Sequence, residues 1–409
     1  MKILYLVHQF YPEFYTGTEK FVLQMAMMMQ KFGNKVKVIT YSFYENSFYD
    51  ESMGNILLKE FSFKGIPVLA FKYKKMPMGL HHSLENEDLA KIADKLITKE
   101  KPDVVHVGHP MRVHELIRAS KNLGIPYILT LTDFWLMCPK TILLNSRGDL
   151  CAGPKGGAEC RDFCPEFQEK FIIDRLSAAR DIIINAKSIV APSKFAASMF
   201  KKEFPDVPIR VINHGISYRK IKRNDRFYNK QDKLTFAYRG SLNPHKGVHI
   251  LIDAFKMVRS NNVVLKIFGS GPNSYVNKLF DMARGDKRIE FCGVYSEDHS
   301  EEILSNIDVT IVPSLWYENY PLVLHESLAC NVPVVASNIG GMAEKIKDGI
   351  NGFTFKVGDS ASLKEILERI ANNPQILNEL KAKMDDLMIP TVEQEAYAYE
   401  REYRRVING

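Results

Sequence analysis

Short apolar runs alternate with helical patterns along most of the chain. The run ILYLV at 3–7 is followed by the helical pattern FVLQMAMMMQKF and then by KVKVIT, and a second series of this kind begins with LTFAYRG at 234–240. Buried strands separated by helices are typical of parallel sheets with crossover helices. The stretch between the two series, 218–233, is charged and poorly apolar, which favours a linker. The sequence therefore predicts an α/β protein of two doubly wound, Rossmann-like domains, 1–205 and 206–389, facing a central cleft, with a helix over 390–409 that packs back on the first domain.

The length of 409 residues suits two domains, and the net charge of +7 is modest for such a chain. Part of the charge lies in two basic clusters, at 71–76 and 218–233. Solvated loops explain such clusters, and the alternative is contact with anionic lipid head groups or a phosphate-bearing substrate. We find no nucleic-acid-binding signature. The chain starts without the cleavage site of a secretion signal, and no apolar run is long enough to span a bilayer, so we expect a cytoplasmic protein whose contact with the inner face of the membrane, where it has one, is peripheral.

Two glutamates flank an expected helix start in the segment ENYPLVLHES, residues 318–327. Pro321 suits the first helical position, where a missing N–H costs nothing. The free backbone amides and the positive end of the helix dipole would then stabilise a phosphate. Glu318 lies in the loop before this helix and Glu326 a little over one turn into it, and carboxylates there suit hydrogen bonds from sugar hydroxyls. The alternative, an exposed glutamate that favours a helix start, explains either acid alone but not the pair.

The spacing of these acids resembles the Glu-x7-Glu signature of glycosyltransferase family 4, which comprises retaining enzymes of the GT-B fold that use nucleotide sugars. Other motifs support the resemblance by their order and spacing over nearly the whole chain. They are TGTEKFVLQMAMMMQKFGNKVKVIT (16–40), PDVVHV (102–107), APS (191–193), VINHGIS (211–217), YRGSLNPHKG (238–247), LKIFGSGP (265–272), RIEFCG (288–293) and VPVVASNIGGMAEKIKDGINGFTF (332–355). The resemblance implies an acceptor-binding first domain, a donor-binding second domain, and transfer of a hexose-type unit from a nucleotide diphosphate sugar to an acceptor hydroxyl.

The family pattern, transferred position by position, makes Glu318 the acid that faces the donor sugar and Glu326 the acid that holds the ribose hydroxyls. It makes Lys246 a cation that neutralises the diphosphate, helped in most members by an arginine five residues earlier. Here that position is Ser241, and Arg239, on the same face of a presumed strand, is the candidate substitute. The resemblance assigns further donor-binding positions to Gly17, whose loop lets the backbone approach the leaving phosphate, and to Gly269, Val294, Tyr320, Pro321, Leu322 and Val323.

A second departure from the family lies in TLTDFW, at the end of the fourth strand of the first domain. Many members have a histidine at the position of Thr132. A retaining mechanism in which the leaving phosphate assists the incoming hydroxyl needs no protein base, so the resemblance still implies catalysis. Asp133, which we group with Glu318 and Lys246 as catalytic, either orients the acceptor or caps a following helix. His106 and His109 are candidates to line the same site, with a structural role as the alternative.

The sequence contains no Asp-x-Asp, the metal-binding pattern of the other large glycosyltransferase fold. We therefore expect catalysis without a metal ion or other cofactor, with Lys246 and helix amides compensating the charge. Four of the six cysteines lie within 27 residues: Cys138, Cys151, Cys160 and Cys164. A structural zinc bound by four thiolates and free thiols packed as small apolar groups explain this cluster equally well, and disulfides are the third alternative.

The expected acceptor is a growing surface glycan, such as a polysaccharide, a lipopolysaccharide or a glycolipid. Two other functions stay open. One is a catalytically weak GT-B protein that binds nucleotide sugars, which the departures at Thr132 and Ser241 favour. The other is a GT-B nucleotide-sugar epimerase, although no set of catalytic acid and base around the donor is evident.

Overall fold

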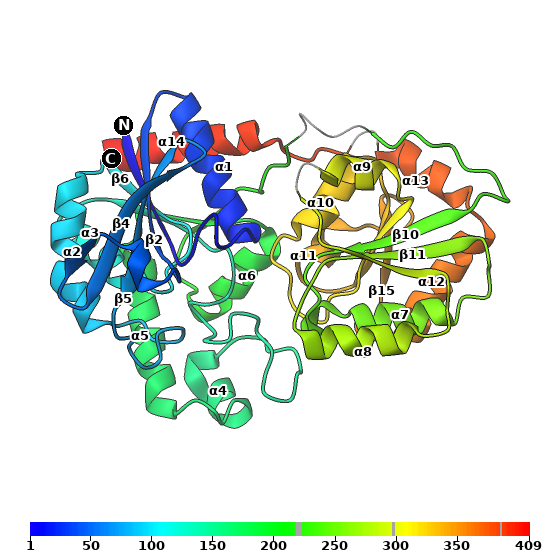
Figure 1. The fold of residues 1–409 in the computed structure, drawn as a ribbon, viewed down its shortest axis with the longest axis horizontal. Helices are drawn as coiled ribbons and strands as arrows, with labels where there is room; N and C mark the ends of the chain where they lie inside the picture. Colours follow the sequence, from blue (N-terminus) through cyan, green and yellow to red (C-terminus); the bar gives the residue numbers. More distant parts are fainter. Residues whose placement is uncertain (218–222, 297–298, 385–386) are drawn as a thin grey trace. The chain divides into compact units, whose positions relative to one another are not determined.

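The computed structural model describes residues 1–217, 223–296, 299–384 and 387–409, and Figure 1 shows their course. They form two compact units, residues 1–214 with 392–409 and residues 215–391. The boundary falls at 214/215 rather than 205/206, because strand β9 (Ile209–Val211) pairs with β8 (Ser188–Ala191) of the first unit. Residues 218–222 of the basic stretch 218–233 lie outside the described residues.

The first unit contains a mostly parallel sheet with the strand order β3-β4-β5-β2-β1-β6-β7-β8-β9. Strand β4 pairs antiparallel with β3 on one side and with β5 on the other, and β5 pairs with β2 in parallel. The order reverses at β1, which lies between β2 and β6, and ligands bind beyond the carboxyl ends of the strands at such a switch point. The remaining strands are β1 (Lys2–Val7), β2 (Lys35–Tyr41), β3 (Glu51–Met53), β4 (Ile56–Phe63), β5 (Ile66–Tyr73), β6 (Val104–Val107) and β7 (Tyr127–Thr130).

Helix α14 brings the end of the chain onto the first unit, where it lies beside α1. Its Tyr399 and Tyr403 are fully buried, and the hydroxyl of Tyr403 lies 2.5 Å from Nδ1 of His106. The other ring nitrogen of His106 lies 2.8 Å from the hydroxyl of Thr130, so this histidine belongs to the core. The helices of the unit are α1 (Gly17–Lys31), α2 (Glu87–Glu100), α3 (His114–Asn122), α4 (Ala158–Phe163), α5 (Glu169–Asn185), α6 (Lys194–Glu203) and α14 (Val392–Asn408).

The second unit contains a fully parallel sheet with the strand order β12-β11-β10-β13-β14-β15. Strands β13 and β14 are buried along their whole length, as expected for a sheet covered on both faces. The order reverses between β10 and β13, which places the binding edge at the ends of these two strands. The strands are β10 (Leu234–Arg239), β11 (Val263–Phe268), β12 (Ile289–Gly293), β13 (Val309–Val312), β14 (Val334–Ser337) and β15 (Gly352–Phe355).

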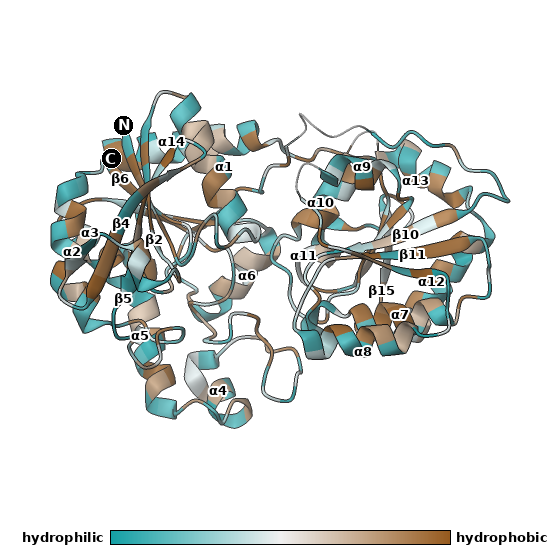
Figure 2. Cartoon of the chain, viewed as in Figure 1, coloured by the Kyte–Doolittle hydropathy of each residue, from teal (hydrophilic) through white to brown (hydrophobic). Residues whose placement is uncertain are grey.

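The helices of the second unit cover this sheet. In Figure 2 they carry hydrophilic and hydrophobic residues together, as helices do when one face lies on a sheet and the other meets solvent. Across the described ranges, no helix is both long and apolar enough to cross a bilayer. The helices are α7 (Val248–Lys256), α8 (Asn273–Ala283), α9 (Ser300–Ser305), α10 (Leu322–Ala329), α11 (Gly340–Lys345), α12 (Ser360–Asn372) and α13 (Ile376–Met384).

Candidate functional site

Glu318 and Lys246 form an ion pair at the binding edge of the second unit. Oε1 of Glu318 accepts hydrogen bonds from Nζ of Lys246 at 2.8 Å, from Oγ of Ser314 at 2.8 Å and from Nε1 of Trp316 at 2.9 Å. The other oxygen, Oε2, accepts none from the described residues. Burial alone would raise the pKa of Glu318, but the Lys246 ammonium and these hydrogen bonds hold it below its ordinary value. The carboxylate is therefore charged, with one oxygen open to a ligand.

Close backbone contacts fix this pair. Gly247, which follows Lys246, has φ +72°, and a Cβ atom there would lie 1.9 Å from the carbonyl oxygen of Pro313 after β13. On the other side, the amide of Gly341 donates to the carbonyl of Glu318 at 2.7 Å, and a Cβ at Gly341 would lie 2.4 Å from the carbonyl oxygen of Asn319. Glycines at these two positions therefore let the Lys246 turn and helix α11 approach the loop that carries Glu318.

Helix α10 starts at Leu322, with Pro321 as its N-cap and not as its first helical residue. The carbonyl of Pro321 accepts from the amides of Leu324 and His325. Among the described residues, no backbone carbonyl accepts a hydrogen bond from the amides of Leu322 and Val323. These two amides and the helix dipole make the start of α10 suitable for an anion, as expected from the sequence.

Arg239 forms an ion pair with the second acid, Glu326. Its side chain is completely buried, and Nη1 donates to Oε2 of Glu326 at 3.2 Å. Nη2 donates to the carbonyl of Val323 at 3.0 Å and to the hydroxyl of Ser327 at 3.2 Å. The hydrogen bonds of the guanidinium are therefore made to helix α10, including its acid Glu326. This geometry gives no support to the interpretation of Arg239 as a cation for the diphosphate in place of the missing arginine at Ser241.

The other expected donor-binding positions are distributed around these groups. Ser241 is exposed after β10, and its carbonyl accepts from the hydroxyl of Tyr238. Gly269 follows β11 where a Cβ would lie 1.8 Å from the carbonyl oxygen of Gly240. Val294 is 64% exposed after β12, and the ring of Tyr320 stacks on His325 at 3.6 Å.

Trp316 is a site residue that the sequence analysis missed. Its indole donates to Glu318, and its ring lies under the Lys246 ammonium, 4.9 Å from Nζ to the ring centroid. A tryptophan two residues before the acid, in a loop that follows a buried strand, was the available signal. The indole thereby restricts both partners of the ion pair.

In the first unit, His109 and Asp133 form a hydrogen-bonded pair after β6 and β7. Nδ1 of His109 accepts from the amide of Met111 at 3.1 Å, so its other nitrogen, Nε2, carries the proton and donates to Oδ2 of Asp133 at 2.8 Å. Oδ1 of Asp133 accepts from the amide of Trp135 at 2.8 Å and thus fixes a turn, because no helix follows here. Asp133 is thus both a cap of that turn and a partner of His109. The hydroxyl of Thr132 donates to the carbonyl of Gly108.

His8 and Glu19 extend this cluster, and the sequence analysis missed both. The ring of His8 contacts that of His109, with the ring centroids 4.0 Å apart and the planes tilted by 32°, and its Nε2 lies 3.6 Å from Oε1 of Glu19. Burial, together with His109 and Arg112, holds the pKa of His8 well below its ordinary range. Oε2 of Glu19 accepts from the amide of Thr16 at 2.7 Å, beside Gly17 at the start of α1. The two groups lie at the switch point of the first sheet.

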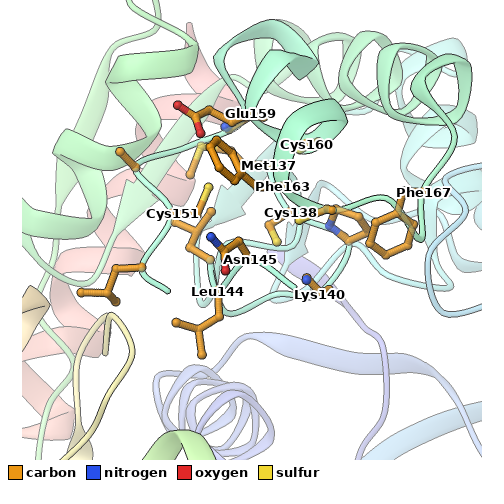
Figure 3. A pocket seen from close by; sticks show the side chains of 16 residues that line it. Met137, Cys138, Lys140, Leu144, Asn145, Cys151, Glu159, Cys160, Phe163 and Phe167 are labelled. Atoms are coloured by element: carbon orange, nitrogen blue, oxygen red, sulfur yellow. The ribbon is translucent and has the colours of Figure 1, made fainter. Parts of the chain in front are cut away.

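The expectation of a structural zinc is not supported. Among the described residues, no three histidine, cysteine or acidic side chains are arranged to hold one metal ion. All six cysteines are free thiols, and burial raises the pKa of Cys138 and Cys151. The four clustered cysteines line one pocket of the first unit, which Figure 3 shows.

Comparisons with known proteins agree with this architecture. The family model described as Glycosyltransferase Family 4 matches residues 15–220, and the model described as Glycosyl transferases group 1 matches residues 220–386. The lipopolysaccharide 1,2-N-acetylglucosaminetransferase of Salmonella typhimurium is 29% identical over 186 residues, which are 41% of this chain and 49% of that protein. The phosphatidyl-myo-inositol mannosyltransferase of Propionibacterium freudenreichii is 30% identical over 175 residues, 41% of this chain and 43% of that protein. The chain spans about half the length of the curated relatives it matches.

Solved structures match over the whole chain. Anabaena HepE in complex with UDP and glucose has a TM-score of 0.71 at 18% identity and covers 99% of this chain and 100% of its own. The sucrose-phosphate synthase of Thermosynechococcus elongatus has a TM-score of 0.73 at 15% identity and covers 99% and 98%. These likenesses confirm the expected GT-B fold.

Proposed function

The chain belongs to glycosyltransferase family 4, and from this premise we propose that it moves a sugar from a nucleoside diphosphate sugar to an acceptor hydroxyl with retention at the anomeric carbon. We assign the donor to the second unit and the acceptor to the first. The observation that carries the proposal is the charged pair of Glu318 and Lys246 beside the start of α10. A cation, free amides and an open carboxylate oxygen suit a diphosphate that is joined to a sugar.

Each group of the second unit then has a distinct part in the reaction. Lys246 and the amides of Leu322 and Val323 bind the diphosphate and stabilise the charge that grows on it as the glycosidic bond breaks. Oε2 of Glu318 faces the sugar, where positive charge develops. Glu326, held by Arg239, accepts hydrogen bonds from the ribose, a contact made equally before and during bond breaking.

The acceptor side draws support from the His109 and Asp133 pair. The Nε2–H group of His109 donates a hydrogen bond to Oδ2 of Asp133 and keeps that carboxylate oriented, and the Asp133 side chain is partly exposed. We assign Asp133 the role of orienting the acceptor hydroxyl. The proton of that hydroxyl is taken by the leaving phosphate. The names of the relatives, a lipopolysaccharide transferase and a phosphatidylinositol mannosyltransferase, support a glycolipid or other surface glycan as acceptor.

Catalysis is proposed to need no metal ion, because the sequence lacks Asp-x-Asp and Lys246 is available for the diphosphate. Transfer should therefore survive EDTA. Loss of transfer in EDTA with recovery in magnesium or manganese, while the protein stays folded, would contradict this.

We extend the proposal to peripheral contact with the membrane that carries the acceptor. The segment after β5 supports it, since Met78 is 99% exposed and Met76 54% exposed, next to the exposed Lys74 and Lys75. Apolar side chains beside lysines suit an anionic lipid surface. The protein should sediment with phosphatidylglycerol vesicles, and the double variant Met76→Ser, Met78→Ser should sediment less. The proposal would be contradicted if the protein sedimented equally with neutral vesicles, or if the double variant sedimented as well as the parent protein.

The donor site can be tested by calorimetric titration with UDP, GDP and ADP, followed by UDP-glucose and other sugars on the preferred nucleotide. Lys246→Ala should weaken nucleotide binding, whereas Lys287→Ala, at an exposed position of the same unit, should not. Release of nucleoside diphosphate together with a glycoside product separates transfer from simple binding and from epimerisation. Absence of binding by all three nucleotides, or binding indifferent to Lys246→Ala, would overturn the proposal.

A further inference from the structure

Arg112 places a partly buried cation at the binding edge of the first unit. It follows β6 in the turn before α3, and its φ of +64° lies in the left-handed region that favours glycine. Its Nη1 donates to the carbonyl of His8, directly after β1, at 3.0 Å. Its guanidinium carbon lies 5.4 Å from the ring centroid of Tyr41, the last residue of β2, and 5.0 Å from that of Phe43. The cation therefore lies where the carboxyl ends of β1, β2 and β6 meet, at the switch point of the sheet.

No carboxylate forms an ion pair with this guanidinium among the described residues. Glu19 is the acid that acts on it electrostatically, but the oxygens of Glu19 face the Thr16 amide and the ring of His8. Burial lowers the pKa of Arg112 to about 10, although Tyr41 and Glu19 act in the opposite direction. Arg112 is thus charged at neutral pH, and a charge in this environment costs free energy unless an anion compensates it.

The guanidinium also has hydrogen-bond donors to spare. Nη2 donates to Nδ1 of His81 at 2.7 Å, and His81 is exposed, so this end of the guanidinium lies near solvent. A guanidinium has five N–H groups, and the carbonyl of His8 and the ring of His81 take up two of them. Nε is buried and has no acceptor in the described part of the chain.

Other buried polar atoms beside Arg112 lack hydrogen bonds as well. Within the described ranges, Nδ1 of His8, Oε1 of Glu19 and the hydroxyl of Tyr41 have no hydrogen-bond partner. Buried polar atoms are rarely left unpaired in native proteins, and each that is unpaired needs an explanation. A cluster of such atoms around an uncompensated cation, at the switch point of a sheet, indicates a site for a polar ligand.

This cluster adjoins the groups that we assign to the acceptor. The backbone carbonyl of His8 binds Arg112, and the ring of His8 contacts His109, which holds Asp133. Arg112 and Asp133 therefore lie on two sides of one pair of histidines. A cation on one side and a carboxylate on the other suit a ligand that has both an anionic group and a hydroxyl.

We propose that Arg112 binds an oxyanion of the acceptor, a carboxylate or a phosphate group, while Asp133 orients the acceptor hydroxyl. The inference rests on the proposed function, which assigns the acceptor to the first unit. The N–H groups of a guanidinium form a fork that matches two oxygens of a carboxylate or phosphate. Asp133 repels an anion, so the oxyanion and the hydroxyl occupy separate ends of the site. The acceptor is therefore an acidic or phosphorylated glycan and not a neutral one.

The test uses pairs of small probes that differ in their charged group. Methyl glucuronide is compared with methyl glucoside, and glycerol 3-phosphate with glycerol, by calorimetric titration of the Lys246→Ala protein, in which the proposed diphosphate site of the second unit is disabled. At least one anionic probe should bind, and its neutral counterpart should bind at least about tenfold more weakly, as expected for the loss of charged hydrogen bonds. The pair that responds shows whether the oxyanion is a sugar carboxylate or a phosphate.

Variants in the same background assign the binding to Arg112. Arg112→Gln should remove the preference for the anionic probe, whereas Arg112→Lys, which keeps the charge but not the fork, should weaken binding less. The matched control Arg180→Gln, at an exposed arginine of α5 in the same unit, should keep the parent affinity. Circular dichroism checks that each variant is folded.

Two results would overturn the inference. One is the absence of binding by both anionic probes to the Lys246→Ala protein, which retains Arg112 and needs no further variant. The other is equal affinity of Arg112→Gln and its parent for the anionic probe. Nucleoside diphosphate binding by Arg112→Gln with Lys246 intact should equal that of the unaltered protein, and this separate measurement distinguishes failure of the acceptor inference from failure of the proposed transferase function.

Discussion

Removal of the Glu318 carboxylate tests the proposed donor site most directly. In Glu318→Ala, Lys246 loses its partner at 2.8 Å, and the hydroxyl of Ser314 and the indole of Trp316 lose their acceptor. The carboxylate side chain is only 10% exposed, so its charge acts on a bound sugar with little screening by water. An electrostatic contact of this kind is worth about 2–4 kcal/mol in the transition state, which lowers the turnover number about 30- to 1,000-fold.

Donor affinity should respond differently from turnover. Lys246 is released from its ion pair in Glu318→Ala and becomes fully available to the diphosphate, so the dissociation constant for the nucleoside diphosphate should stay the same or fall. Two donors lose a buried acceptor, and the free energy of unfolding should therefore drop by about 1–3 kcal/mol. The two effects together separate a catalytic acid from a residue that only maintains the fold.

The assay is steady-state release of nucleoside diphosphate at saturating donor, with calorimetric titration for affinity and circular dichroism for folding. Glu290→Ala, at an exposed glutamate of β12 in the same unit, is the matched control and should leave all three measurements unchanged. A folded Glu318→Ala protein with full turnover would refute the reasoning and reduce Glu318 to a residue of the loop before α10.

Other predictions concern the remaining groups. Glu326→Ala should raise the KM for the donor about tenfold or more while the turnover number changes little, since the ribose contact acts before and during bond breaking; a fall in turnover alone would contradict this assignment. Asp133→Asn should raise the KM for the acceptor and spare nucleotide binding, whereas a loss of both would indicate a structural role for its turn. Glu115 is 5% exposed, and burial raises its pKa to about 7. The folded state thus favours the protonated carboxyl of Glu115. This contribution to the free energy of unfolding is fully present below the pKa of the unfolded chain and is lost as the pH rises through about 7, a decrease of about 3 kcal/mol in total. Glu115→Gln should flatten that part of the pH profile of unfolding, and an unchanged profile would count against it.

The sequence predicted the parallel strands well because each is a short run that is buried along its whole length, such as β6 and β13. It did not predict the antiparallel addition β3–β5. Strand β4 has buried residues only near its start and alternates between half-buried and exposed residues toward its end, so it lacks the continuous apolar run of the others. The turn at Lys64 and Gly65, both with positive φ, was the available signal of a hairpin.

At the candidate site, the sequence indicated which residues matter but not how they pair. Lys246 and Glu318 lie 72 positions apart, and their direct contact depends on the approach of Gly247 to the carbonyl of Pro313. Such contacts arise from the packing of separate elements and leave no local pattern. The same holds for His8, whose importance comes from its ring contact with His109, about a hundred residues further along the chain.

The departure at Ser241 leads to a last prediction. Arg239 is buried in an ion pair with Glu326. Among the groups that we assign to the diphosphate, Lys246 is therefore the one cation, and it also forms an ion pair with Glu318. Ser241 is exposed, which leaves room for a longer side chain, and the family resemblance places an arginine at this position. Ser241→Arg should therefore lower the dissociation constant for the nucleoside diphosphate about three- to tenfold, and the gain should shrink as salt screens the added charge. Ser305→Arg adds the same charge at an exposed position at the end of α9 and should change affinity little. Equal affinity of both variants and the parent protein would mean that the diphosphate does not lie beside Ser241, and the assignment of Lys246 to the diphosphate would fall with it.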